Sequence, residues 1–212
     1  MRVLELFSGT GSVSKVAKEL NWEVISLDLK NADINVDILN WNYKSYPKGH
    51  FDIIWASPPC DTFSKLRDTW IGRKLKKHGD TIITKEIIIE DMMKEGLPIL
   101  NKTKEIINYF NPSYWFMENP QTGRMKEFNN ELPFYDIDYC KYSDWGYRKR
   151  TRIWTNVKNF NAKLCCKDCD SFVNGRHNIQ LGVKTYGVNK NEKYRIPPLL
   201  IEELFECILK DM

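Results

Sequence analysis

Short apolar runs alternate with amphipathic stretches along most of the chain. The apolar runs end at turn-forming residues and predict strands over Arg2–Phe7, Glu23–Leu27, Asp52–Ala56, Tyr114–Met117, Ile137–Tyr139 and Ile153–Asn156. Apolar residues at helical spacing predict helices over Ser12–Leu20, Ile87–Phe110 and Leu199–Leu209. Because strands alternate with helices, the pattern favours an α/β fold in which helices cover both faces of a mostly parallel sheet.

The length of the chain and a change of pattern near residue 157 predict one domain with a small excursion. The chain has 212 residues, which is the size of a single domain. Residues 157–193 lack clear periodicity and hold a group of three cysteines. We therefore expect a core over 1–156, a small irregular excursion over 157–193, and a C-terminal helix in 194–212 that returns to the core.

Composition narrows the class of protein. With 42% hydrophobic residues the chain can bury a full core, which excludes a mostly disordered protein. Its apolar runs fall short of the roughly 18 residues of a membrane helix, and Met1–Glu5 lacks the start of a secretory signal. The six cysteines do not form a disulfide framework. We expect a protein with reduced thiols that is neither membrane-bound nor secreted, in the cytoplasm or, in a eukaryote, the nucleus.

Positive charge is concentrated in two clusters, although the net charge is only +4. Six Lys and Arg residues stand against one acid between Lys65 and His78, and four of the five residues in Arg148–Arg152 are cations. Two clusters of this kind favour a polyanionic partner such as a nucleic acid. The alternative for either cluster alone is a solvated surface.

A glycine-containing loop, Phe7-Ser8-Gly9-Thr10-Gly11, follows the first predicted strand. Glycines at this position let the backbone approach a ligand and turn into a helix. Asp28 ends the second predicted strand, where its carboxylate can accept hydrogen bonds from both hydroxyls of a ribose. Asp37, which precedes Ile38, can accept one from an adenine amino group. The alternative is that both acids are turn or capping residues.

A cysteine follows two prolines at the end of the third predicted strand. Pro58 and Pro59 stiffen the approach to Cys60 and place its thiol on a loop. A free thiol has a pKa near 8.5, so a useful fraction of thiolate calls for nearby positive charge. The cationic clusters are candidates to supply it, and we interpret Cys60 as a nucleophile rather than a buried apolar residue.

Two further motifs carry charged side chains at strand ends. Glu118 and Asn119 end the strand Tyr114–Met117. Burial there favours the protonated form of a carboxyl group, which can then donate a proton. Strand alternation places Arg150 and Arg152 on one side of the strand that follows them. The alternatives are a surface turn and a basic edge strand.

Taken in order, these motifs resemble the cytosine-5 DNA methyltransferase family over about residues 1–156. The resemblance implies a Rossmann-like fold of the S-adenosylmethionine-dependent methyltransferases and duplex DNA as substrate. It also implies that Cys60 adds to C6 of a flipped-out cytosine, that Glu118 holds or protonates N3, and that Arg152 helps to hold O2. The implied catalytic residues are Cys60, Glu118, Asn119, Arg150 and Arg152. The implied binding residues for S-adenosyl-L-methionine are Phe7, Ser8, Gly9, Thr10, Gly11, Asp28, Asp37, Ile38 and Pro58.

The chain departs from the family pattern at several places. Asp61 and Arg148 stand where members commonly have Gln, and Arg195–Leu200 replaces a closing Asn-Ser motif. Only residues 157–193 are available for a target-recognition region, which is substantial in family enzymes. We therefore expect sequence specificity to be low, to come from residues 65–92, or to need a partner protein.

Three alternatives stay open at this stage. One is the same chemistry on RNA, as in the branch of the family that acts on transfer RNA. Another is a non-catalytic module that binds cofactor and nucleic acid, although the presence of Cys60, Glu118 and Arg152 argues against it. The last is transfer of a different one-carbon group, or modification of a free nucleotide.

A group of three cysteines and a histidine lies in the excursion. Cys166 and Cys169 have the spacing of a zinc knuckle, and Cys165 and His177 are further candidate ligands. Adjacent cysteines rarely bind the same ion, and the spacing matches no established zinc pattern. The sequence therefore favours reduced thiols in a loop, with no metal, over a zinc site.

Overall fold

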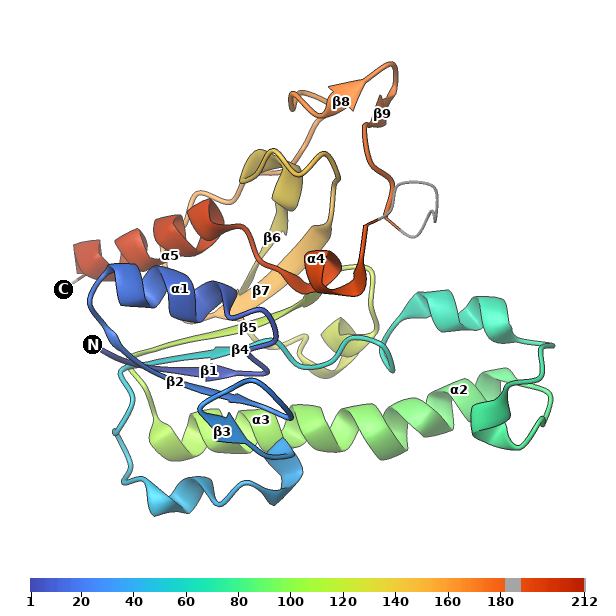
Figure 1. The fold of residues 1–212 in the computed structure, drawn as a ribbon, viewed down its shortest axis with the longest axis horizontal. Helices are drawn as coiled ribbons and strands as arrows, with labels where there is room; N and C mark the ends of the chain where they lie inside the picture. Colours follow the sequence, from blue (N-terminus) through green and yellow to red (C-terminus); the bar gives the residue numbers. More distant parts are fainter. Residues whose placement is uncertain (182–187, 212) are drawn as a thin grey trace.

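The structure of the chain, a computed structural model, describes residues 1–181 and 188–211 (Figure 1). Over these residues a central sheet has the strand order β3-β2-β1-β4-β5-β7-β6. Its strands are β1 (Arg2–Leu6), β2 (Glu23–Asp28), β3 (Ile34–Asn35), β4 (Ile53–Ala56), β5 (Tyr114–Pro120), β6 (Phe134–Asp138) and β7 (Arg150–Thr155). The α-helices are α1 (Ser12–Glu19), α2 (Lys85–Asp91), α3 (Leu97–Phe110), α4 (Lys190–Tyr194) and α5 (Pro198–Asp211).

Strands β1 to β5 are parallel, whereas β7 runs antiparallel to both of its neighbours. The chain starts in the middle of the sheet, moves outward to β3, and then crosses over β1 to form β4. The strand order therefore reverses between β1 and β4. Ligands of open α/β sheets bind beyond the carboxyl ends of the strands at such a reversal. The expected α/β fold with a mostly parallel sheet is confirmed.

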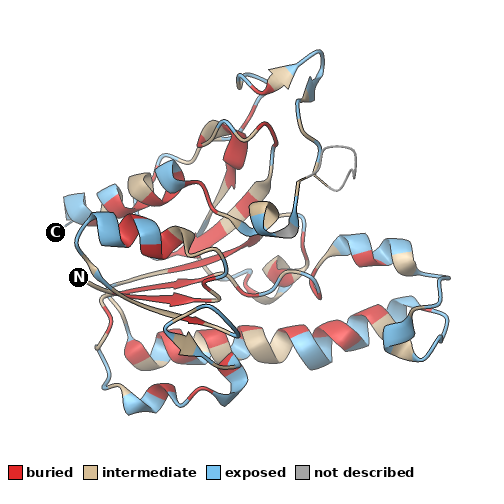
Figure 2. Ribbon diagram, in the orientation of Figure 1, coloured by how far each residue is buried: buried red, intermediate tan, exposed pale blue. Residues whose placement is uncertain are grey.

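Alternating side chains of the central strands build two separate cores. Val3 and Ile53 point to one face, where α1 and α5 pack, and Leu4 and Ile54 point to the other face, where α3 packs. Figure 1 shows this three-layer arrangement, and Figure 2 shows that the inward sides of these helices are the buried ones. Because both faces are covered, β1 is buried except at Arg2 and β4 is buried along its whole length.

The expected helix Ile87–Phe110 is part of one continuous helical segment that contains an irregular turn. Helices α2 and α3 are joined by a π-helical turn over Met92–Gly96. Gly96 lies against Thr62 and Phe63, and a Cβ at Gly96 would overlap the Thr62 hydroxyl. The absence of a side chain there lets the segment that follows β4 rest directly on the helix.

Residues 60–84 form an arm of short 3₁₀ turns, namely η3 (Lys65–Trp70) and η4 (Lys76–His78), that extends past the edge of the cores (Figure 1). Its basic cluster is partly neutralised. Arg67 is buried and ion-paired with Asp91, and Lys77 pairs with Glu95 at 2.7 Å. The remaining cations of the cluster are exposed and form no ion pair within the described part of the chain, namely Lys65, Arg73, Lys74 and Lys76.

The excursion contains little regular structure in its described part. A short hairpin, β8 (Phe172–Val173) with β9 (Arg176–His177), projects beyond β6 and β7 (Figure 1). Helix α5 then packs against α1. The division into 1–156, 157–193 and 194–212 stays a proposal, and residues 182–187 of the excursion lie outside the described residues. No helix in the described ranges has both the length and the apolar character to cross a membrane.

Candidate active site

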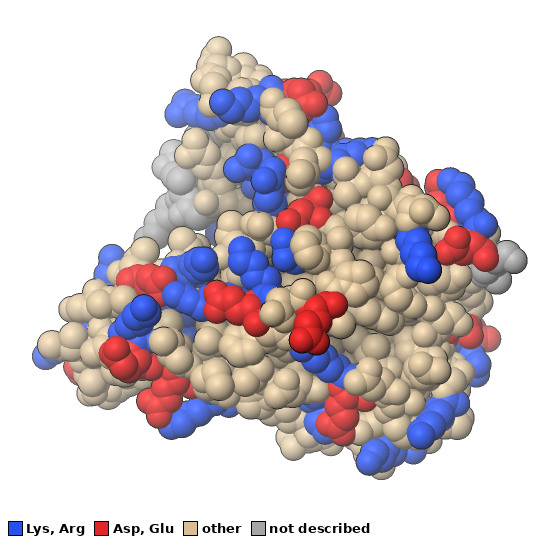
Figure 3. Space-filling model, turned by 180° about the vertical axis from the view of Figure 1, so that it is seen from behind, with Lys and Arg blue, Asp and Glu red and all other residues tan. Residues whose placement is uncertain are grey.

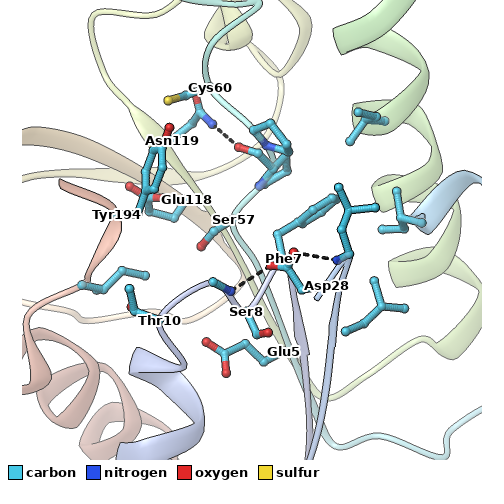
Figure 4. Close-up of a pocket in the computed structure, with 18 of the residues that line it drawn as sticks. Glu5, Phe7, Ser8, Thr10, Asp28, Ser57, Cys60, Glu118, Asn119 and Tyr194 are labelled. Atoms are coloured by element: carbon cyan, nitrogen blue, oxygen red, sulfur yellow. Dashed lines mark hydrogen bonds between the residues drawn. The ribbon is translucent and has the colours of Figure 1, made fainter. Parts of the chain in front are cut away.

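A cavity of about 420 Å³ opens beyond the carboxyl ends of β1, β2, β4 and β5. Figure 4 shows side chains from these strand ends facing the same space, with Cys60 and Glu118 toward one end and Phe7 and Asp28 toward the other. Most of the site residues expected from the sequence line it, namely Phe7, Ser8, Gly9, Thr10, Asp28, Asp37, Ile38, Pro58, Cys60, Glu118 and Asn119. Gly11, Arg150 and Arg152 do not.

The loop after β1 is held in an unusual backbone conformation. Gly9 and Gly11 have φ values of 49° and 65°, in the left-handed region that glycine adopts without strain. Gly11 is the residue that precedes α1, so its role is to start that helix rather than to line the cavity. Phe7 shares this conformation, with a φ of 60°, which a side chain rarely adopts and which marks a site under functional constraint.

Asp28 connects β2 to this loop. Its Oδ2 accepts a hydrogen bond from the Gly9 amide at 2.8 Å, and its Oδ1 accepts one from the Leu29 amide at 2.6 Å. A carboxylate has about four acceptor positions, so each oxygen keeps one for a ligand. Asp28 therefore both shapes the loop and presents acceptors to the cavity.

Asp37 and Ile38 form the wall next to Asp28. Asp37 begins a 3₁₀ turn, η1 (Ile38–Asn40), and its Oδ1 accepts a hydrogen bond from the Leu39 amide at 2.9 Å. Ile38 is buried, and together with Val36 it gives this part of the cavity an apolar surface. Both the capping function and the binding function foreseen for Asp37 are thus geometrically possible.

Glu5 is a lining residue that the sequence patterns did not single out. It is 3% exposed, and it accepts hydrogen bonds from the Val13 and Ser14 amides at 3.2 and 3.0 Å and from the Ser14 hydroxyl. These amides belong to the first turn of α1, where a carboxylate is favoured by the helix dipole. Burial raises the pKa of Glu5 above its ordinary value.

Cys60 sits at the opposite end of the cavity, on the loop that follows β4. The Asn119 amide donates a hydrogen bond to the Pro58 carbonyl at 2.8 Å, which ties this loop to the end of β5. Asn119 is almost fully buried, so this contact positions the cysteine loop. Burial, and then the carboxylate of Glu118, raise the pKa of the Cys60 thiol, while Lys149 acts in the opposite direction.

Of the two expected basic clusters, the second lowers the pKa of the Cys60 thiol through Lys149, but burial has the larger, opposite effect. Most of the cluster over residues 65–78 points into solvent or into ion pairs on the arm. Lys149 is the neighbouring cation that lowers the thiol pKa, and its effect is smaller than that of burial.

Glu118 ends β5 beside Cys60 and is 6% exposed. It accepts a hydrogen bond from the Tyr139 hydroxyl at 3.3 Å, and the Lys149 ammonium lies 3.5 Å from the same oxygen. Burial holds the pKa of Tyr139 well above its ordinary range, so this phenol remains a hydrogen-bond donor. Lys149 also lies over the Tyr139 ring, 4.8 Å from its centre. Glu118, Tyr139 and Lys149 form a connected polar group at the cysteine end.

Arg150 and Arg152 point away from this group. Strand register pairs Glu118 with Ile153 and Asn119 with Arg152, so the even-numbered residues of β7 face the side opposite to Glu118. Arg150 binds Asp138 at 2.6 and 3.0 Å, and Arg152 binds Asp136 at 2.7 and 2.8 Å. The two arginines do share one side of the strand as expected, but on that side they pair with aspartates of β6, and the lysine that lines the cavity is Lys149.

The C-terminal part of the chain closes the cavity. Tyr194 at the end of α4 and Ile196 after it line the cavity, and the Ile196 amide donates to the Ser12 hydroxyl at 3.1 Å. Figure 4 shows the Tyr194 ring beside Glu118 and Asn119. These two residues form the wall at the segment where the family pattern places its Asn-Ser motif, and no sequence motif had marked them.

Comparison with known proteins identifies the family. No family model matches the chain. A probable DNA (cytosine-5)-methyltransferase of Frog virus 3 (isolate Goorha) is 44% identical over 219 residues, covering 97% of this chain and 99% of the viral protein. The solved structure of the Entamoeba histolytica methyltransferase EhMeth has a TM-score of 0.51 at 17% identity and supports the fold alone. It matches 78% of this chain, which spans 55% of that longer protein. Because the viral relative is similar over nearly the whole of both chains, the chain belongs to the DNA (cytosine-5)-methyltransferase family.

Proposed function

We propose that the protein transfers a methyl group from S-adenosyl-L-methionine to C5 of a cytosine in DNA, through a covalent bond between Cys60 and C6. The observation that carries this proposal is the placement of Cys60 and Glu118 at one end of a cavity whose other end presents Asp28 and the Phe7–Gly9 loop. The name of the viral relative supports DNA as the substrate.

The cofactor end of the cavity fits S-adenosyl-L-methionine by the chemistry of its donors and acceptors. Asp28 keeps acceptor capacity for the two ribose hydroxyls, and the exposed carboxylate of Asp37 can accept from an adenine amino group. Val36, Ile38 and Ile99 supply the apolar walls that a purine ring requires. When bound, the cofactor supplies an electrophilic methyl group.

Cys60 and Glu118 carry the chemistry on the base. The Cys60 thiolate forms a bond to C6, and the electron pair of the C5–C6 double bond moves toward C5 while Glu118 holds N3 or passes it a proton. C5 is then nucleophilic and takes the methyl group, whose former bonding pair stays on the donor sulfur. Water takes the C5 hydrogen as a proton, the C–H electron pair re-forms the C5–C6 double bond, the C6–sulfur pair returns to Cys60, and a proton held on N3 returns to Glu118. Such a sequence avoids a full negative charge on the ring.

Lys149 takes the part that the resemblance gave to Arg152. Its side chain is 14% exposed and its ammonium lies 3.5 Å from Glu118, where a base bound by Glu118 would present its other polar groups. It also offsets the charge of Glu118 next to the Cys60 thiol. Arg150 and Arg152, which are held by aspartates of β6, would then stabilise the β6–β7 edge rather than the base.

The target cytosine has to leave the duplex to reach Cys60, at a cost of a few kcal/mol. Contacts between cations and phosphates offset part of this cost. The exposed cations of the arm and those of the excursion are the candidates for this role. Figure 3 shows Lys and Arg side chains on the arm, on the excursion and between them, interspersed with acids. Contacts with phosphates do not depend on the base sequence. This agrees with low sequence specificity, or with a partner protein that supplies the specificity.

The test is covalent trapping on duplex DNA that carries 5-fluorocytosine, with tritiated-methyl S-adenosyl-L-methionine. This base carries fluorine in place of the C5 hydrogen. Because fluorine cannot be removed as a cation, the elimination that releases Cys60 is blocked and the adduct persists. We expect a labelled protein–DNA band that survives denaturation and is absent for Cys60→Ala, with Cys207→Ser as the matched control that keeps it. A band with transfer RNA and none with DNA would move the substrate to RNA. No band with either, while cofactor still binds, would favour the non-catalytic module.

A further inference from the structure

A cluster of thiols and one imidazole lies outside the lining of the cavity, where the excursion meets the end of β6. Cys140 follows β6, Cys165 and Cys169 belong to the loop that begins the excursion, and His177 lies on β9. Their ligand atoms all lie within 4.8 Å of one another. We propose that Cys140, Cys165, Cys169 and His177 bind one structural Zn²⁺ ion that fixes the excursion to the catalytic sheet.

The distances between the ligand atoms agree with a tetrahedral site. Cys165 Sγ lies 3.6 Å from Cys169 Sγ, and His177 Nε2 lies 3.6 Å from Cys165 Sγ and 3.3 Å from Cys169 Sγ. Tetrahedral zinc with bonds of about 2.3 Å to sulfur and 2.0 Å to nitrogen separates two sulfurs by about 3.8 Å and sulfur from nitrogen by about 3.5 Å. Cys165, Cys169 and His177 therefore already stand at separations that fit a zinc ion, and the Cys140 thiol lies within 4.8 Å of each of them.

The type and burial of the ligands also suit zinc. Three thiols and one imidazole are a common donor set of closed structural zinc sites. Cys140 and Cys165 are buried, while Cys169 and His177 are partly buried. Cys166 is exposed and is not part of the cluster, which removes the objection that two adjacent cysteines would have to bind one ion. The missing ligand was Cys140, which stands 25 positions before Cys165.

The surroundings of the cluster stabilise a site with three thiolates. Zn²⁺ with three thiolates and a neutral imidazole has a net charge of −1. Two cations lie next to the cluster, because Lys141 follows the ligand Cys140 and Arg150 pairs with Asp138. The Cys165 amide donates to Asp138 Oδ2 at 2.9 Å, and the same buried carboxylate holds Arg150. Outer partners of this kind fix the ligands in place. Lys141 also pairs with Asp168 at 3.0 Å, which anchors the loop between the two cysteine ligands.

A metal ion supplies what this part of the chain lacks. The described part of the excursion has a two-stranded hairpin of four residues and few buried apolar side chains. Such a small segment rarely stays ordered without a metal or a disulfide. The ion would join the end of β6, the loop over 165–169 and β9, and would thereby hold the β8–β9 hairpin at a fixed position relative to β6 and β7.

Metal content of the full chain tests the proposal. After expression with added zinc and purification without chelators, we expect about one zinc per chain by mass spectrometry of the elements. Cys140→Ser, Cys169→Ser and His177→Ala should each lower this content to about a tenth or less. Cys166→Ser and His50→Ala are the matched controls, and they should keep it. A wild-type chain without zinc that also takes up none on titration would overturn the proposal. So would equal losses from Cys166→Ser and Cys169→Ser.

Measurements on the wild-type chain keep the test decisive if a ligand variant does not fold. Replacement of zinc by Co²⁺ should give the intense visible bands of a tetrahedral ion and a thiolate charge-transfer band. Alkylation mapped by mass spectrometry should modify Cys166 at once, and Cys140, Cys165 and Cys169 only after a chelator is added. Labelling that is unchanged by the chelator, or a disulfide between two of the three, would contradict the proposed site.

Discussion

The rim of the cavity and the excursion are fixed in space by different kinds of force. At the rim, the cysteine loop follows the buried strand β4, Glu118 and Asn119 lie near the end of β5, and a buried hydrogen bond from Asn119 to Pro58 links the two. The excursion instead follows β7, one strand in from the edge of the sheet, and its described part has a short hairpin, the first residues of α4 and the cluster around Cys165. The comparison teaches that the sheet positions the residues of the chemistry, while a few side chains position the region available for recognition. A change that disrupts one region should therefore leave the other intact.

Loss of the nucleophile is the strongest test of the rim. Cys60→Ala should lower turnover by about 10⁴-fold or more, because the covalent path is removed. Cofactor affinity should stay within about twofold, since Cys60 lies at the far end of the cavity from Asp28. Radiolabelled methyl transfer and calorimetric titration measure the two quantities. Methylation by Cys60→Ala would show that the reaction does not pass through this thiol.

Removal of zinc is the matching test of the excursion. A chelator should raise hydrogen exchange of residues 165–177 by about 100-fold, because metal binding and local folding are coupled. The amides of β1 and β4 should be unaffected, since both strands lie between two apolar cores. Exchange read by mass spectrometry separates the regions within one sample. Equal deprotection of both would mean that the molecule unfolds as one unit.

Asp28→Ala sharpens the comparison within the rim. Loss of a carboxylate that accepts from ribose should weaken cofactor binding by about 10- to 100-fold, as expected for hydrogen bonds to a charged group. DNA binding should change by less than about twofold. Asp33→Ala is the matched control, because Asp33 is exposed, accepts hydrogen bonds from Ser26 and does not line the cavity. Equal losses of both ligands in Asp28→Ala would place the cofactor elsewhere.

The smallest expected effect concerns the charges around Cys60. Its pKa is raised by burial and by Glu118 and lowered by Lys149. Alkylation by iodoacetamide should therefore rise with pH through a value above that of a free thiol, because the thiolate reacts. Glu118→Gln should shift this profile to lower pH, and Lys149→Met should shift it to higher pH. A profile that moves in the same direction in both variants would contradict the proposed electrostatics.

Features of the rim could be predicted from the sequence where local patterns carry them. The strands β1, β2 and β4 could be predicted from local patterns, and the glycine loop, Asp28 and Cys60 stand at or just beyond their ends, so these residues could be assigned before the sheet order was known. The sequence could not show that Arg152 faces away from Glu118, because alternation only divides the residues of a strand between two sides. Which side faces Glu118 depends on the register between β5 and β7, a pairing that no local pattern contains.

Long-range contacts account for the rest of what the sequence missed. Tyr194 and Ile196 reach the cavity from the other end of the chain. Cys140 completes the thiol cluster across the excursion, whereas the local spacing suggested the exposed Cys166. The π-helical turn at Met92–Gly96 ends at the glycine against which Thr62 and Phe63 lie. In each case the decisive partner is far away in the sequence.

The hydrogen bond between the Ile196 amide and the Ser12 hydroxyl bears on the order of events during synthesis. It joins positions 184 residues apart, and both flank the cofactor end of the cavity. The first strands and the cysteine loop can emerge from the ribosome and collapse early, because a chain is made at about 5–20 residues per second. The wall of the cavity closes only after residue 196 has emerged. A nascent chain would therefore carry Cys60 beside an incomplete cavity. Tight binding of the cofactor would require that residue 196 has emerged and formed the wall.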